Sequence, residues 1–111
     1  MFFEQGELIE ANFTPAAGHE PLKRRSAVVV SLGHFNNVIS SLAVVCPITS
    51  TNNGHPLHVA LKDTQAVQGC ICIEQVRAVD LGARQVKKLG DFLDEETMSE
   101  VLNKLAAIFG I

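Results

Sequence analysis

The sequence predicts a mainly β protein: a small, mostly antiparallel barrel closed by an amphipathic helix at the C-terminal end. Two observations carry this prediction. The first two thirds of the chain hold short apolar runs separated by polar turn residues, which is typical of closely spaced strands. The last segment changes to apolar positions three and four residues apart, which indicates a helix. With 111 residues, a single domain spanning 1–111 is expected.

Five strands are expected in the first part of the chain. One very apolar run contains Ala-Val-Val-Val, and another is followed by the turn cluster Thr-Ser-Thr-Asn-Asn-Gly. The expected strands are 8–13, 26–32, 42–48, 57–61 and 69–77. In the last of them, Cys70 and Cys72 should share one face, because side chains alternate along a strand.

The C-terminal segment carries one apolar stripe at helical spacing. Its members are Met98, Val101, Leu102, Leu105, Ile108 and Phe109. Asp94 is the expected N-cap, and Glu95 and Glu96 then lie in the first turn, where the helix dipole favours negative charge. Gly110 is a natural stop for this helix.

Composition excludes several classes of protein. A hydrophobic share of 47% against 19% charged residues excludes a disordered chain. The longest apolar runs are five residues, far short of the roughly 20 that a membrane span needs. The N-terminal residues lack the cationic start of a secretory signal, and three cysteines without framework spacing favour a reducing compartment. We therefore expect a cytoplasmic domain without a membrane partner.

The distribution of charge matters more than the net charge of −3. Residues 91–104 hold five acids and one base, a local charge of −4, which leaves +1 for the rest of the chain. The bases cluster at 23–25 and in the segment 77–88. An acidic terminal element can therefore coexist with a basic surface, and the net charge does not exclude a nucleic-acid ligand.

No familiar metal or phosphate motif is present: there is no glycine-rich phosphate loop, no Cys-x-x-Cys and no His-Glu-x-x-His. His55 and His58 are expected to be surface or turn histidines, with rings on opposite faces if they lie in a strand. Cys70 and Cys72 are expected to be half-buried and Cys46 to be in the core, since two thiolates do not complete a tetrahedral site. No metal and no cofactor is expected.

Two loops could form a phosphate site. The segment 18–25, Gly-His-Glu-Pro-Leu-Lys-Arg-Arg, brings an imidazole, a carboxylate and three cations to a loop before a buried strand. The segment 47–51 brings hydroxyls to the end of the other very apolar strand. If those strands are neighbours, the two sets converge in an arrangement that suits a phosphate. A solvated, charged loop is the alternative interpretation of 18–25.

A third polar segment, Glu-Gln-Val-Arg-Ala-Val-Asp at 74–80, follows a predicted strand. Gln75 and Arg77 would lie on one face of that strand, with Arg84 further along the chain. This face could hold a nucleic-acid backbone. The alternative is an exposed ion pair between Arg77 and Asp80, worth less than about 1 kcal/mol.

Taken in order, six segments resemble the MazF/PemK/Kid toxins. They are Gly-Glu-Leu-Ile at 6–9, Ala-Gly-His-Glu at 17–20, Arg-Ser-Ala-Val-Val-Val-Ser at 25–31, Phe-Asn at 35–36, Pro-Ile-Thr-Ser at 47–50 and the segment 74–80. Each piece alone is weak, but the order and spacing of all six are specific. The resemblance covers nearly the whole chain, from residue 6 to the terminal helix.

The resemblance implies an SH3-like barrel with a C-terminal helix, working as a homodimer. It also implies a metal-independent, sequence-specific endoribonuclease that cuts single-stranded RNA (mRNA) and is neutralised by a cognate antitoxin. The shared catalytic pair of the family matches Arg25 and Thr49, and the loop base or acid matches Glu20 or His19. The implied or predicted RNA contacts are Lys23, Arg24, Glu74, Gln75, Arg77 and Arg84.

The chain departs from the family pattern at several positions. Ser26 stands where most members have a proline, which would have fixed φ. Cys72 and Glu74 stand where some members have an arginine and an aspartate, and Glu10 replaces an aromatic residue. Two alternatives to a nuclease are a CcdB-like gyrase-binding toxin of the same fold and an interaction module with an eroded catalytic site.

Overall fold

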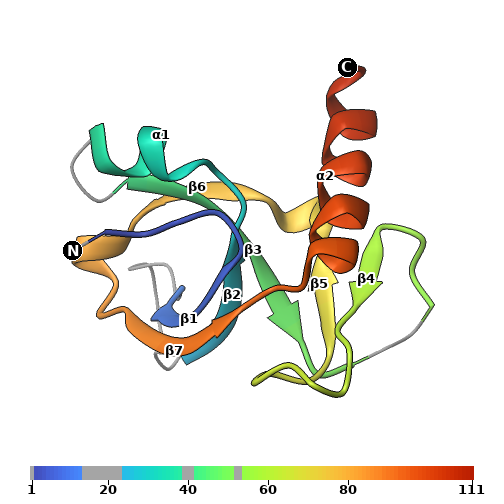
Figure 1. The fold of residues 1–111 in the computed structure, drawn as a ribbon, viewed down its shortest axis with the longest axis horizontal. Helices are drawn as coiled ribbons and strands as arrows, with labels where there is room; N and C mark the ends of the chain where they lie inside the picture. Colours follow the sequence, from blue (N-terminus) through green and yellow to red (C-terminus); the bar gives the residue numbers. More distant parts are fainter. Residues whose placement is uncertain (1, 14–23, 39–41, 52–53) are drawn as a thin grey trace, which may run out of the picture.

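The computed structural model describes residues 2–13, 24–38, 42–51 and 54–111. These residues form seven strands, two α-helices and two short 3₁₀ helices (Figure 1). In chain order they are β1 (Glu7–Asn12), β2 (Arg24–Val29), α1 (Gly33–Val38), β3 (Leu42–Thr49), β4 (His58–Ala60), β5 (Cys70–Cys72), η1 (Ile73–Gln75), β6 (Arg77–Asp80), η2 (Leu81–Ala83), β7 (Lys87–Phe92) and α2 (Glu95–Phe109).

Every strand pairing is antiparallel, and the strand order is β4-β5-β3-β2-β1-β7, with β6 paired to β3 off this path. The eight-residue β3 organises the sheet. Its first half pairs with β6, its middle with β2, and its last two residues, Ile48 and Thr49, with β5. The expected mainly β, antiparallel fold with a C-terminal helix is confirmed.

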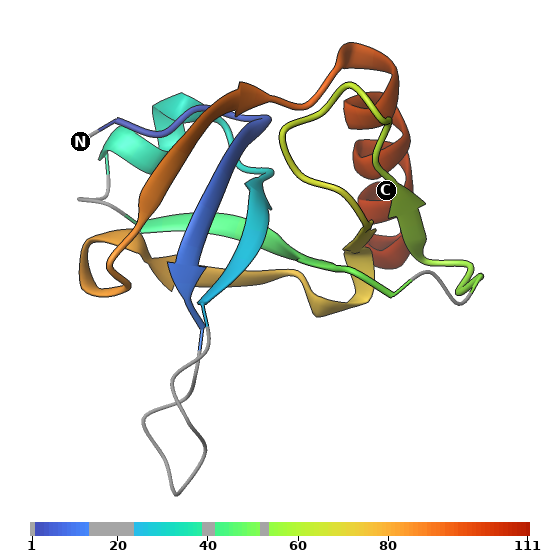
Figure 2. The same ribbon diagram turned by 90° about the horizontal axis from the view of Figure 1, so that it is seen from below.

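The central strands are buried on both faces, and this explains their nearly continuous apolar sequences. One core cluster includes Leu8, Val28 and Cys46 and reaches Val101 on α2. The other lies on the opposite face of the same strands and includes Ile9. In Figures 1 and 2, α2 stands at one end of the curled sheet, beside β4 and β5, so the first cluster lies beneath the helix.

Helix α2 begins and ends where the sequence predicts. The Asp94 carboxylate accepts hydrogen bonds from Thr97 N at 3.1 Å and from Thr97 Oγ1 at 2.6 Å, and Gly110 adopts the left-handed φ of 71°. The apolar stripe is only partly covered, since Val101 is buried while Phe109 is 65% exposed. At 15 residues α2 is too short to cross a membrane, and no other helix of the described residues is long and apolar enough to do so.

Several predicted boundaries were wrong. The expected strand 69–77 is divided, because the 3₁₀ helix η1 interrupts it and Arg77 begins a new strand, β6. The strand β7 was not predicted, since its sequence Lys-Lys-Leu-Gly-Asp-Phe is polar and the strand lies half exposed at the sheet edge. Helix α1 was also missed. Its buried Asn36 donates to the carbonyls of Phe3 (2.9 Å) and Ser31 (3.1 Å), a tertiary network without local periodicity.

Candidate functional site

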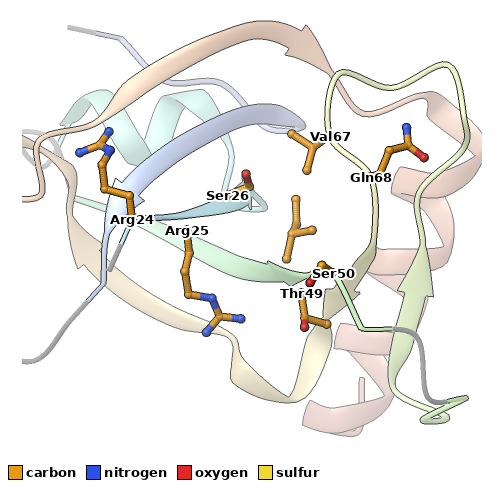
Figure 3. Close-up of a pocket in the computed structure, with 8 residues that line it drawn as sticks. Arg24, Arg25, Ser26, Thr49, Ser50, Val67 and Gln68 are labelled. Atoms are coloured by element: carbon orange, nitrogen blue, oxygen red, sulfur yellow. The ribbon is translucent and has the colours of Figure 1, made fainter. Parts of the chain in front are cut away.

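A pocket of about 450 Å³ opens where β2 begins and β3 ends (Figure 3). Figure 3 shows the side chains of Arg25 and Thr49 on the same side of the sheet, separated by the mouth of the pocket. The residues that line it are Arg24, Arg25, Ser26, Ile48, Thr49, Ser50, Val67 and Gln68. The described end of the first segment, Arg24 and Arg25, and residues 48–50 of the second therefore line one pocket.

Strand register explains why Arg25 and Thr49 line the same pocket. Strands β2 and β3 run antiparallel with Ala27 opposite Pro47, and the same register continued by two residues sets Arg25 opposite Thr49. The pairing stops at Ala27, because the end of β3 turns to pair with β5 through Thr49 and Cys70. The strands diverge there, and the space between them is the pocket.

Thr49 is held from two sides. Its Oγ1 accepts a hydrogen bond from Thr51 N at 3.2 Å, which orients the hydroxyl at the end of the strand. On the other side Gly69, at a φ of +127°, packs so closely that a Cβ at this position would lie 2.1 Å from the Thr49 carbonyl oxygen. Only a glycine at position 69 therefore allows the two backbones to lie this close together.

Three arginine side chains, Arg25, Arg77 and Arg84, lie close enough to influence one another electrostatically beside the pocket. Burial lowers the pKa of Arg77, and the positive charges of Arg84 and Arg25 lower it further. The charge of Arg25 also reaches Cys72: burial and Glu74 raise the pKa of that thiol, and Arg25 opposes them. Three arginines from β2, β6 and the end of η2 thus give this face a positive potential, which suits an anionic ligand.

Two of these arginines also bind the end of β1. Arg77 Nη2 donates to the Phe13 carbonyl at 3.1 Å, and its guanidinium lies 4.9 Å from the centre of the Phe13 ring. Arg84 Nη1 donates to the Asn12 carbonyl at 3.4 Å. The expectation that Gln75 and Arg77 share a strand face was wrong, because Gln75 is an exposed residue of η1.

Arg24 lines the pocket but is bound to β1, and three other predicted site residues lie outside the described ranges. Arg24 Nε contacts Glu10 Oε1 at 2.8 Å, and its Nη2 donates to the Glu10 carbonyl at 3.2 Å, so this guanidinium is held by β1. His19, Glu20 and Lys23 lie outside the described residues.

His55 is the exposed turn histidine that the sequence predicts, whereas His58 begins β4 with its side chain only 10% exposed. His55 precedes β4 in a turn closed by a hydrogen bond from His58 N to the His55 carbonyl (3.0 Å), so the two rings stack with centroids 4.6 Å apart. Opposite faces were expected only if both histidines lay in one strand, and only His58 lies in β4. His58 Nε2 also contacts Glu74 Oε2 at 3.1 Å. Burial raises the pKa of Glu74, but the hydrogen bond and charge of His58, a backbone hydrogen bond and the charge of His55 together outweigh it, and the pKa lies below its ordinary value.

The three cysteines are all buried. Cys46 is fully enclosed, and burial together with the nearby Cys72 and Glu74 raises the pKa of its thiol to about 12. Cys70 and Cys72 are 2% and 1% exposed, so the prediction that they are half-buried was wrong. One cause is that β5 lies between β3 and β4 in the sheet, so both of its edges are covered by a paired strand.

Sequence reasoning missed Gly69, Val67 and Gln68 as parts of the site. The long connection from β4 to β5 carries Val67 and Gln68 to the pocket and sets Gly69 against Thr49, and nothing in their local sequence marks them as site residues. The pairing of His58 with Glu74 was missed as well, because it joins residues 16 positions apart. Only tertiary structure brings these groups together.

Comparison with known proteins gives one consistent result. Residues 4–109 match the family model described as PemK-like, MazF-like toxin of type II toxin–antitoxin systems. The chain is 36% identical to the endoribonuclease toxin ChpB of Escherichia coli (strain K12), over 96% of this chain and 93% of that protein. It is 34% identical to the Escherichia coli endoribonuclease PemK, over 95% of this chain and 80% of that protein. The fold matches a MazE–MazF crystal structure from Deinococcus radiodurans with a TM-score of 0.91 and 32% identity, covering 100% of this chain and 98% of that one.

Proposed function

Because the chain belongs to the PemK-like, MazF-like toxin family of type II toxin–antitoxin systems, we propose that it is an endoribonuclease that cuts single-stranded RNA sequence-specifically. The observation that carries this proposal is the shared pocket of Arg25 and Thr49. A guanidinium and a hydroxyl at the mouth of one pocket, beside further arginines, form a phosphodiester-binding arrangement.

In the proposed reaction the RNA supplies its own nucleophile. The ribose 2′-oxygen attacks the adjacent phosphorus, the bond to the 5′-oxygen breaks, and the products carry a 2′,3′-cyclic phosphate and a 5′-hydroxyl. Arg25 holds the phosphate and stabilises the charge that develops on its oxygens, and Thr49 donates a hydrogen bond to the same group. This scheme is metal-independent, because the guanidinium supplies the positive charge.

Two protons must move in this reaction. Glu20 or His19 takes the proton of the 2′-hydroxyl, and Arg25 or His19 gives one to the departing 5′-oxygen. A positioned acid or base contributes about 10²- to 10⁴-fold in rate. Rates of Glu20→Gln and His19→Gln variants, measured side by side, identify which residue is the base.

We also propose that the toxin works in the cytoplasm as a homodimer and is neutralised by a cognate antitoxin. Toxins similar in fold have been crystallised with their antitoxin, as in the MazE–MazF structures. The RNA contacts proposed beside the pocket are Arg24, Glu74, Gln75, Arg77 and Arg84. Lys23, the sixth contact expected from the sequence, lies outside the described residues.

The test is cleavage of a defined, end-labelled transcript by purified protein. Arg25→Ala should lower the single-turnover rate at least about a hundredfold. Arg25→Lys keeps the charge but loses the planar guanidinium, so its rate should lie between those of the wild type and Arg25→Ala. Lys62→Ala is the control for the loss of one positive charge, since Lys62 pairs with Asp94 outside the pocket.

A second substrate tests the nucleophile. A transcript with a single 2′-deoxyribose at the scissile position should remain uncut at that position, because the attacking hydroxyl is missing. Cleavage of that substrate, or an Arg25→Ala variant that cuts at the wild-type rate, would contradict the mechanism. Intact RNA together with growth arrest would favour the CcdB-like alternative.

A further inference from the structure

Outside the pocket, a second cluster of chemically active side chains joins the turn before β4 to η1. His55, His58 and Glu74 each offer one ligand atom, and these three atoms all lie within 4.8 Å of one another. The sequence alone gave no reason to join them, because the two histidines lie far from Glu74 along the chain. We propose that these three residues form a binding site for a divalent transition-metal ion, with Zn²⁺ as the expected occupant.

The contact between His58 and Glu74 already has the dimensions of a metal site. Zn–N and Zn–O bonds are about 2.0–2.2 Å, so two ligands of a tetrahedral zinc ion lie roughly 3.4 Å apart. His58 Nε2 and Glu74 Oε2 are 3.1 Å apart. An ion that replaces the proton between them therefore needs only a small separation of the two side chains.

His58 is also an unusual residue for a protein interior. Its side chain is 10% exposed, and its Nδ1 is buried with no hydrogen-bond partner among the described residues. Buried polar atoms are nearly always paired, so an orphaned imidazole nitrogen calls for an explanation. The explanation we propose is that His58 binds the metal through its other nitrogen, Nε2, which faces Glu74.

His55 supplies the adjustable third ligand. Its Nδ1 accepts a hydrogen bond from Leu57 N at 3.1 Å, which identifies that nitrogen as unprotonated, the state that a metal ligand needs. His55 is exposed, so a shift of the ring from its stack on His58 displaces no core residue.

The donor set selects the ion. Two imidazoles and one carboxylate suit zinc, and three protein ligands leave a fourth position for water. The hard cations Mg²⁺ and Ca²⁺ prefer sites made of oxygen ligands alone. The bound ion would tie the β4 turn to η1, and it plays no part in the cleavage scheme.

The experiment uses the untagged full chain and Co²⁺ as a spectroscopic probe, with Zn²⁺ as competitor. Wild-type protein should bind one Co²⁺ per chain, show the visible absorption of a four-coordinate ion, and lose it when Zn²⁺ is added. His55→Gln, His58→Gln and Glu74→Gln should each weaken binding at least about tenfold, the scale set by losing a group that supports a metal.

His34→Gln is the matched control, because His34 is an exposed histidine of α1 outside the cluster. It should bind Co²⁺ as the wild type does. The proposal is overturned if the wild type shows no saturable binding, if His55→Gln binds as well as wild type, or if His34→Gln weakens binding as much as His55→Gln. The exposed His55 keeps the test decisive even where His58→Gln fails to fold.

Discussion

Substitution of Gly69 by alanine should damage catalysis without touching any residue that contacts RNA. A Cβ at Gly69 would lie 2.1 Å from the Thr49 carbonyl oxygen, and real Cβ contacts are essentially never closer than 3.0 Å. The two backbones must therefore separate by at least 0.9 Å. Because Thr49 ends β3 at the pocket, this separation moves its hydroxyl relative to Arg25.

The expected loss follows from that displacement. A misplacement of roughly 1 Å at a catalytic group costs about a hundredfold in rate. We expect Gly69→Ala to cut a defined transcript at about one hundredth of the wild-type single-turnover rate. Strain at a positive φ adds a stability cost of about 1–3 kcal/mol, so rates are measured at a temperature where circular dichroism shows the variant to be folded.

Gly90→Ala separates these two effects. Gly90 also has a positive φ, +75°, but a Cβ there meets nothing within 4 Å. This variant should lose stability and keep the wild-type cleavage rate. The reasoning is refuted if folded Gly69→Ala cuts as fast as Gly90→Ala.

Three further predictions concern the RNA surface, the helix cap and the buried thiols. Arg77→Ala should reduce the slope of log RNA affinity against log salt by about 0.7, the value for one phosphate contact on a single strand, in fluorescence-anisotropy titrations. Asp94→Ala should lower the melting temperature by about 5 °C through loss of the N-cap, and the difference should shrink as the pH falls from 4 towards 2. Hydrogen bonds from Thr97, then Lys62, hold the pKa of Asp94 in the folded protein at about 2, against its ordinary 3.8. The cap therefore stabilises the fold fully above pH 3.8 and loses its effect as the pH falls towards 2. A difference in melting temperature that stays constant down to pH 2 would contradict this prediction. Cys46, with a pKa raised from 9.0 to about 12, should react with a thiol reagent at pH 8 roughly a thousandfold more slowly in the native than in the urea-unfolded chain, as mass spectrometry can follow.

The strands that the sequence predicted well are those whose burial is strongest. Val28 and Cys46 lie in strands packed on both faces, so their apolar runs identify β2 and β3 whatever surrounds them. Helix α2 was predicted to within its caps because Asp94 and Gly110 carry local signals. These features are determined by residues that lie close together along the chain, so the sequence alone predicts them.

Features set by tertiary contacts were not predictable in the same way. The strand β7 has a polar sequence and is stabilised by backbone pairing with the edge of β1, where Ile9 lies opposite Lys88. Gly69 matters only because β5 lies against the end of β3. That Arg25 and Thr49 lie near each other was expected if the two very apolar strands are neighbours, and the register of β2 and β3 supplies the physical cause.

Removal of metal tests the cleavage scheme and the histidine cluster independently. Protein treated with EDTA should cut RNA at the untreated rate, because the proposed charge stabilisation comes from Arg25. The same protein should melt at a higher temperature once Zn²⁺ is added, since an ion bound to the folded state stabilises it by mass action. His55→Gln should lose most of this rise, whereas the control His34→Gln should keep it. If EDTA abolishes cleavage, the metal-independent mechanism fails and the cluster stands; if Zn²⁺ leaves the melting temperature unchanged, the cluster fails and the mechanism stands.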